Sequence, residues 1–104
     1  MFYIDKTTHK IILTKGDNAE IIVSIKDVNG IDREIYGDDI ITLTVRKSVN
    51  SAIAVAKTAE KGIISFTPDD TNHLPSGSYV YDVQLKTGAG KIYTIIPKSS
   101  FILG

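Results

Sequence analysis

The chain has 104 residues, of which 42% are hydrophobic, and its 12 basic residues balance its 12 acidic ones. A chain of this length is expected to form a single domain over residues 1–104, and the balanced charge gives no net field that would attract nucleic acid or an anionic membrane. Without any Cys, the fold cannot use disulfides, thiolate metal ligands or a cysteine nucleophile.

The first two thirds of the chain alternate short apolar runs with turn residues, which is typical of an all-β protein. After an edge strand or arm at 1–9, strands are expected at 10–14, 19–26, 33–36, 40–47, 52–58 and 63–67. In the strand 19–26 the odd-numbered positions are apolar and share a face, with Ile22 as the apolar exception on the other face. Asn29-Gly30 predicts the tight hairpin that closes this strand. The alanines of 52–58 are also compatible with a helix, but its β-branched residues favour a strand.

The last third of the chain contains the clearest strand. Pro68 and the aspartates after it suit a single helical turn. A turn at 74–78 then leads into a strongly alternating strand, in which the residues of one face are Tyr79, Tyr81, Val83 and Leu85. The glycine-rich hairpin 86–90 returns into a strand at 91–96 that is apolar on both faces, which indicates a strand covered on both sides or lying against a partner. Pro97 interrupts this strand, and the apolar tail 99–104 is expected to continue it after a bulge.

Gly77, Tyr79 and Tyr81 are the residues to which we assign a structural role. Their Gly-x-Tyr-x-Tyr spacing resembles the tyrosine corner of immunoglobulin-like sandwiches, in which a Tyr hydroxyl bonds to the backbone upstream. Tyr79 is then the corner residue, and Tyr81 takes the position where antibody domains carry their second Cys. Together with a turn signal about every ten residues, these features predict an all-β, immunoglobulin-like antiparallel β-sandwich of about 7–9 short strands.

The acidic residues favour turns over chemical sites. Residues 27–32 place oxygen ligands at alternate positions, as some calcium loops do, but they lack the bidentate Glu of an EF-hand, so a plain hairpin explains them better. The pairs Asp38-Asp39 and Asp69-Asp70 are neighbours in sequence, which usually point apart or are solvated together rather than share acid–base work.

The other chemistry-bearing residues also favour a structural interpretation. His9 and His73 do not have zinc-ligand spacing and are expected to be exposed loop histidines. Gly88 and Gly90 fit a hairpin better than a phosphate loop, and the chain has no nucleophile elbow around a serine. We therefore expect no enzyme activity and no catalytic, cofactor-binding or metal-binding residue. The tyrosines could present an aromatic surface to sugars or proteins, although alternating strand positions are more often core.

Five segments, taken in order, carry a family resemblance: 16–21, 23–27, 43–47, 66–71 and 74–85. Their order and spacing resemble the immunoglobulin-like domains of bacteriophage tail and baseplate proteins, including the N-terminal domain of baseplate upper proteins, and of related prophage proteins. The likeness covers about residues 10–103. It transfers no binding residue, because the shared positions are turn and core positions.

This resemblance implies a non-enzymatic structural, assembly or attachment role in a virion that is assembled in the host cytoplasm. The implied partners are other tail or baseplate proteins or copies of the chain itself, without nucleic acid or membrane. The first residues have no basic segment followed by a long apolar run, so no signal peptide is expected. The alternative is a carbohydrate-binding or adhesin-type immunoglobulin-like module on a bacterial or virion surface, which would use exposed Tyr side chains.

Overall fold

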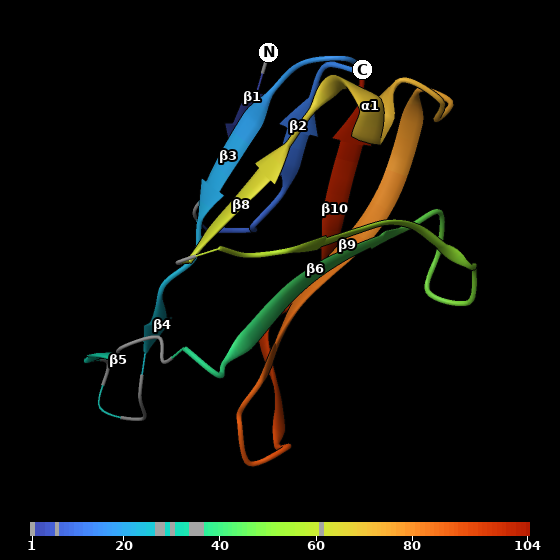
Figure 1. The fold of residues 1–104 in the computed structure, drawn as a ribbon. Helices are drawn as coiled ribbons and strands as arrows, with labels where there is room; N and C mark the ends of the chain where they lie inside the picture. Colours follow the sequence, from blue (N-terminus) through green and yellow to red (C-terminus); the bar gives the residue numbers. More distant parts are fainter. Residues whose placement is uncertain (1, 6, 27–28, 30, 34–36, 61) are drawn as a thin grey trace.

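The computed structural model describes residues 2–5, 7–26, 29, 31–33, 37–60 and 62–104 (Figure 1). Within them the elements are β1 (Phe2–Ile4), β2 (Ile11–Leu13), β3 (Ala19–Ile22), β4 (Ile25–Lys26), β5 (Asp32–Arg33), β6 (Ile40–Arg46), β7 (Ile53–Thr58), β8 (Ile63–Phe66), α1 (Pro68–Thr71), β9 (Gly77–Lys86) and β10 (Ile92–Leu103). The all-β prediction is confirmed. The described residues contain ten strands, more than the predicted seven to nine, because the segment 19–26 divides and β1 forms a strand of its own.

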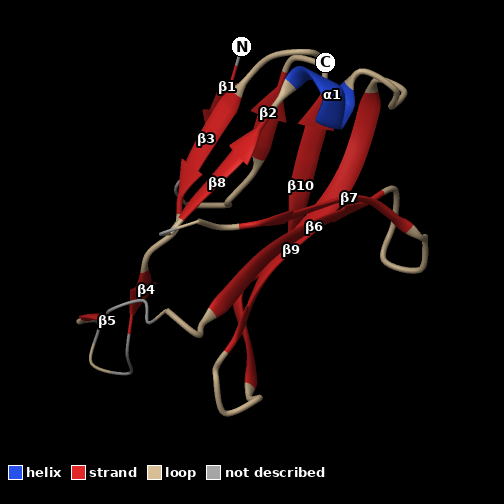
Figure 2. Ribbon diagram, viewed as in Figure 1, coloured by secondary structure: helices blue, strands red, loops and turns tan. Residues whose placement is uncertain are grey.

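The strands form a large sheet and two small ones. The large sheet has the order β1-β2-β10-β9-β6-β7, and the small sheets are β3-β8 and β4-β5. Figure 2 shows β3 and β8 lying over the end of the large sheet that holds β1, β2 and the C-terminal part of β10. The rings of Phe66 in β8 and Phe101 in β10 are 5.9 Å apart and join the two layers.

The core lies between these layers and follows the predicted alternation. Along β9 the inward side chains Tyr79, Tyr81, Val83 and Leu85 are all buried, and the same holds for Ile41, Leu43 and Val45 in β6 and for Ile64 and Phe66 in β8. Tyr81 meets Phe101 edge to face at 6.3 Å between ring centroids. Because no disulfide is available, aromatic and aliphatic packing between the layers supplies the stabilisation.

The prediction of a wholly antiparallel sandwich is wrong at one pair. β2 runs parallel to β10, with Ile11 beside Phe101 and Leu13 beside Leu103. β1 and β2 form an antiparallel hairpin, which turns β2 into the direction of the C-terminal strand. Gly104 extends this pairing, since its N–H donates to the Leu13 carbonyl at 2.9 Å. Local alternation indicates that a segment is a strand, but not which strand it meets or in which direction.

One predicted strand is divided in the structure, and another continues as expected. The segment 19–26 divides at residues 23–24 into β3 and β4, although its predicted inward positions remain buried. The tail continues the last strand past an irregularity at Pro97, as predicted: β10 runs from Ile92 to Leu103, with register shifts between Thr94 and Ile96 and between Ile96 and Ser99. A proline is tolerated there because bulges and sheet edges do not need its missing N–H.

Several other expectations are settled by the structure. Residues 53–58 form a strand rather than a helix, and Pro68–Thr71 form the single helical turn. The hairpin expected at Asn29-Gly30 is flanked by paired strands, Ile25 with Arg33 and Lys26 with Asp32. Most of the turn itself, and residues 34–36 of the strand expected at 33–36, lie outside the described residues.

The tyrosine at the start of β9 has the contact that its spacing led us to expect. The Tyr79 hydroxyl donates a hydrogen bond of 2.6 Å to the carbonyl of Pro75, four residues upstream. Gly77 has φ 148°, a conformation that favours glycine, and it begins β9 just before this bond. The Lys47 ammonium lies 4.8 Å from the centre of the Tyr79 ring on the adjacent strand end. The turn before β9 is therefore fixed by side-chain contacts as well as by its backbone.

Candidate functional site

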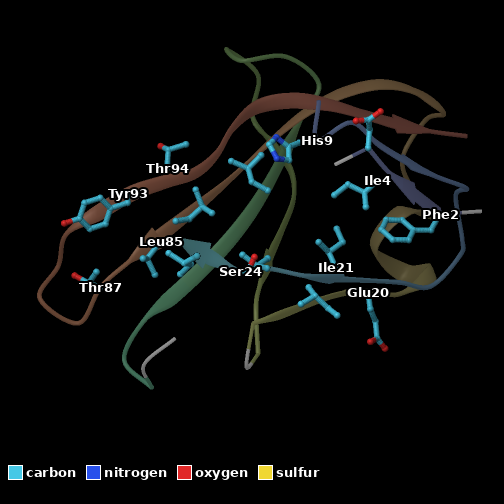
Figure 3. Close-up of a pocket in the computed structure, with 16 residues that line it drawn as sticks. Phe2, Ile4, His9, Glu20, Ile21, Ser24, Leu85, Thr87, Tyr93 and Thr94 are labelled. Carbon is cyan, nitrogen blue, oxygen red and sulfur yellow. The ribbon is translucent and has the colours of Figure 1, made fainter. Parts of the chain in front are cut away.

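An open groove of about 1250 Å³ lies at one side of the sandwich. Figure 3 shows the side chains that surround it. They come from three places: Phe2, Ile4, Asp5 and His9 at the N-terminal hairpin, residues 20–25 on β3 and β4, and Leu85, Thr87 and residues 93–96 on β9 and β10.

The interior of the groove is apolar. Ile21, Val23 and Ile25 belong to the core and also line the groove. Ile95 and Ile96, which line it as well, are partly buried against the same core. At the rim, Ile22 is 81% exposed and Tyr93 is 50% exposed. Single exposed apolar residues are ordinary, but a continuous apolar hollow with exposed Ile and Tyr at its rim is typical of a site that takes a partner.

Two free sheet edges border this groove. β3 belongs to the two-stranded sheet β3-β8, so its side away from β8 has no neighbouring strand among the described residues. β10 is paired with β9 along its length, whereas on its other side β2 reaches only Phe101–Leu103. The described residues thus leave the first part of β10 as a second open edge. Unpaired backbone N–H and C=O groups at such edges are able to bind an added strand.

The turn of the N-terminal hairpin forms one end of the groove. The Asp5 carboxylate accepts hydrogen bonds from the N–H groups of Thr7 at 2.8 Å and Thr8 at 2.9 Å. These bonds, that of Thr8 above all, hold the pKa of Asp5 below its ordinary value of 3.8. The turn ends at His9, whose φ of 62° lies in the left-handed region that His adopts more often than most residues.

Tyr81 ties this turn to the core. Its hydroxyl donates a hydrogen bond to the His9 carbonyl, across 72 positions of sequence. Burial raises the pKa of Tyr81 to about 12, so the hydroxyl keeps its proton at any physiological pH. His9 is half-buried rather than exposed, contrary to expectation, because the turn packs over this tyrosine. The groove therefore has one wall anchored directly to β9.

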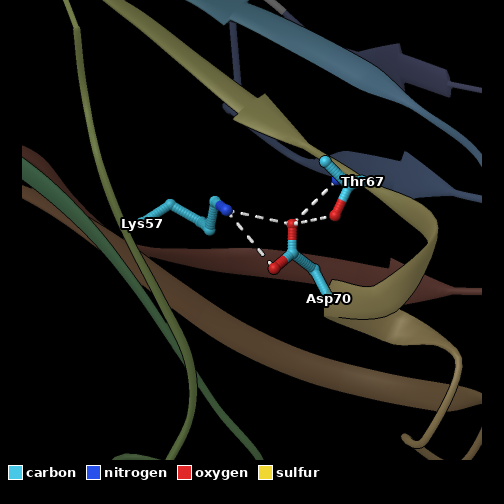
Figure 4. A network of polar contacts seen from close by, with 3 residues as sticks. All are labelled: Lys57, Thr67 and Asp70. Atoms are coloured by element: carbon cyan, nitrogen blue, oxygen red, sulfur yellow. Dashed lines mark hydrogen bonds and ion pairs between the residues drawn. The ribbon is translucent and has the colours of Figure 1, made fainter.

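A second polar network lies on α1. The Asp70 carboxylate accepts from the Thr67 N–H at 2.8 Å and forms an ion pair with Lys57 of β7 at 3.1 Å (Figure 4). Burial raises the pKa of Asp70, but the bonds from Thr67 and Lys57 outweigh it and leave that pKa lower than 3.8. This contact joins an edge strand of the large sheet to the helix that follows β8. Both partners of the Asp70 carboxylate, Thr67 and Lys57, connect elements of the fold, so we assign Asp70 a structural role.

The other sequence candidates do not gather into a site. Asp69 lies within α1 and His73 just after it, both exposed, and Asp38 lies against Gly88 at the tip of the β9–β10 hairpin. The calcium-like segment 27–32 falls mostly outside the described residues. Among the residues that the structure does describe, no group of three or more His, Asp or Glu side chains could hold a metal ion.

The five tyrosines have different environments. Tyr79 and Tyr81 are buried at 5% and 2% exposure, as their alternation predicted, while Tyr3 and Tyr93 are half exposed. Tyr36 lies outside the described residues. The sequence alone did not predict the groove. The only signal for it was that both faces of 91–96 are apolar, which indicated a strand covered on both sides or lying against a partner.

No protein-family model, no curated protein and no solved structure matches this chain. Over the described part of the chain, no helix has the length and hydrophobicity that crossing a membrane requires.

Proposed function

We propose that this chain is a non-enzymatic assembly module that binds a protein partner through the groove between β3–β4 and β10. The observation that carries the proposal is the combination of an apolar hollow of about 1250 Å³ with free sheet edges on two sides. Covering a largely exposed Ile such as Ile22 at the rim contributes roughly 1.5–3 kcal/mol. A groove of this kind suits a polypeptide better than a small polar ligand.

We further propose that the sandwich is immunoglobulin-like. Three neighbouring strands, β6-β9-β10, have the order expected for strands C, F and G, and β3-β8 has the pairing expected for B and E. The tyrosine corner on β9 is at the start of the strand that this assignment makes F. These features support the assignment.

The biological setting that we propose is a bacteriophage or prophage tail, at the baseplate or a fibre, with other tail proteins or copies of the chain as partners. The sequence resemblance to immunoglobulin-like tail and baseplate domains supports this setting, and an open, apolar groove is consistent with a part that is assembled into a larger particle. Genes for tail proteins beside the gene of this chain would support the proposal, and genes of an unrelated cellular pathway would count against it.

The test is association in solution. Light scattering and sedimentation, with the chain alone and mixed with the tail proteins encoded nearby, should reveal a complex. Ile22→Lys, at the groove rim, should abolish it, whereas Ile53→Lys should not, because Ile53 is similarly apolar and 53% exposed but lies on β7. A chain that stays monomeric at high concentration and binds no tail protein would refute the proposal.

The second candidate is a carbohydrate-binding or adhesin-type module. It is favoured by Tyr93, which is half exposed at the groove rim, near Thr87 and Thr94. An aromatic ring beside hydroxyl groups suits the faces and hydroxyls of a sugar. A glycan array tests this directly: binding that Tyr93→Ala removes would favour it, and silence across the array would exclude it.

A further inference from the structure

The two open edges beside the groove differ in how well they are protected against another strand. The free part of β10 contains Pro97 and two register shifts, and Lys98 is exposed beside them. Proline, bulges and lysine are among the devices by which proteins prevent strand addition at an edge. β3 is only four residues long and carries the charged Glu20, but Ala19–Ile22 has no proline, lysine or register shift. An added strand is therefore expected on β3 and not on β10.

The hydrogen bonds of β3 show which of its backbone groups are open. The Val23 N–H donates to the Gly62 carbonyl at 2.8 Å, on the β8 side. In an antiparallel pair these directions alternate along the strand, so Ala19, Ile21 and Val23 point their backbone groups toward β8. Glu20 and Ile22 consequently point their N–H and C=O groups to the groove side. The donors for an additional strand are thus at two defined residues.

The charge of the groove restricts the partner. Among the described lining residues, the carboxylates are those of Asp5 and Glu20, and neither Lys nor Arg is present. Glu20 is exposed and stands on the β3 edge itself, so a strand added there would place a side chain opposite it. A basic side chain at that position is attracted, and an acidic one is repelled. This charge pattern also disfavours a second copy of β3 as the occupant, because it would bring another Glu to the same edge.

We propose that the groove takes an extended segment of another protein, which adds to β3 as a strand, with alternate apolar side chains facing the groove and a basic side chain opposite Glu20. This inference rests on the proposed function and names the partner's chemistry and binding mode. The partner's apolar row would cover Ile95 and Ile96, and its backbone would bond to Glu20 and Ile22.

A peptide series tests the proposal. The probe is a short acetylated and amidated peptide of alternating valine and threonine, made with one lysine at either end. A matched peptide carries glutamate instead, and a third has every second amide N-methylated. Amide hydrogen exchange followed by NMR should show new protection at Glu20 and Ile22, not along β10. Binding should weaken roughly fivefold with glutamate in place of lysine, and should be lost on N-methylation.

Variants of β3 provide the controls. Glu20→Lys should reverse the preference between the lysine and glutamate peptides. Ile22→Pro, which removes an N–H that points away from β8, should weaken binding by roughly tenfold, while Ile22→Thr keeps that N–H and should bind more tightly than the proline variant. If the proline variant does not fold, the charge reversal at Glu20 still decides the matter.

Protection that appears on β10, equal binding of both charged peptides, or concentration-dependent self-pairing of β3 would each overturn this inference. Failure of the whole peptide series at millimolar concentration would do so as well. A complex with tail proteins that Ile22→Lys abolishes would, in that case, still uphold the proposed function and show that the partner is bound in another way.

Discussion

Removal of a single hydroxyl, in Tyr79→Phe, tests the interpretation of the turn before β9. The hydroxyl donates to the Pro75 carbonyl at 2.6 Å, and the side chain is only 5% exposed. The substitution keeps the ring, its place in the core and its contact with the Lys47 ammonium. It therefore removes one hydrogen bond and leaves the packing unchanged.

The expected loss follows from what happens to the two groups in the variant. A hydrogen bond of this kind contributes about 1 kcal/mol net, and a partner left buried without water would raise the loss toward 3 kcal/mol. Pro75 is exposed, so its freed carbonyl can bind water. The free energy of unfolding should consequently fall by about 1 kcal/mol, and the melting temperature of a domain of this size by roughly 4 °C.

Urea unfolding and thermal unfolding, both followed by circular dichroism, measure this loss. The urea midpoint should fall without a change in the denaturant slope, because the surface exposed on unfolding stays the same. Tyr3→Phe is the matched control, since Tyr3 is 51% exposed and its loss should stay within about 0.5 kcal/mol. An unchanged melting temperature in Tyr79→Phe would refute the structural role assigned to this bond.

Three further substitutions address other contacts. Asp70→Asn, which breaks the ion pair with Lys57, should lower stability by about 1 kcal/mol at neutral pH. Because folding lowers the pKa of Asp70, its contribution to stability is fully present above pH 3.8 and is lost as the pH falls through the folded pKa. The urea midpoints of the wild type and of Asp70→Asn should therefore converge in acid, and a gap that stays constant with pH would contradict this. Gly16→Ala should cost about 1–2 kcal/mol in urea unfolding, because φ is 85° and the new Cβ would lie 2.8 Å from the Asn72 amide oxygen; unchanged stability would mean that the turn relaxes. Phe101→Ala, at 1% exposure, should cost about 3–5 kcal/mol, and a thermal midpoint near the wild type would show that the core refills the space.

Local pattern was enough to identify the strands and their buried faces. The alternation of β9 predicted the burial of Tyr79, Tyr81, Val83 and Leu85, because successive side chains of a strand point to opposite faces. The hydrogen bond between Tyr79 and Pro75 could also be predicted from the sequence, since the two residues are only four positions apart. Properties that depend on neighbours in sequence were therefore accessible without a structure.

The candidate site depended on contacts that are distant in sequence. The parallel pairing of β2 with β10 brings together Ile11 and Phe101, and among the described residues it leaves the first part of β10 without a neighbouring strand on one side. Likewise the Tyr81 bond to His9 spans 72 positions and half-buries a histidine that local pattern places on the surface. Register and direction between such segments depend on the packing of the whole chain, which no single segment specifies.

By itself, then, the sequence determined an all-β chain with defined core faces, a tyrosine-anchored turn, and a last strand that is apolar on both sides. Only the tertiary structure decided that this strand borders an open groove, that β3 forms the groove's other wall, and that the two edges differ in protection. The physical reason is that hydrophobic alternation depends on neighbouring residues in the sequence, whereas an open edge depends on which strands pair with one another in the folded sheets.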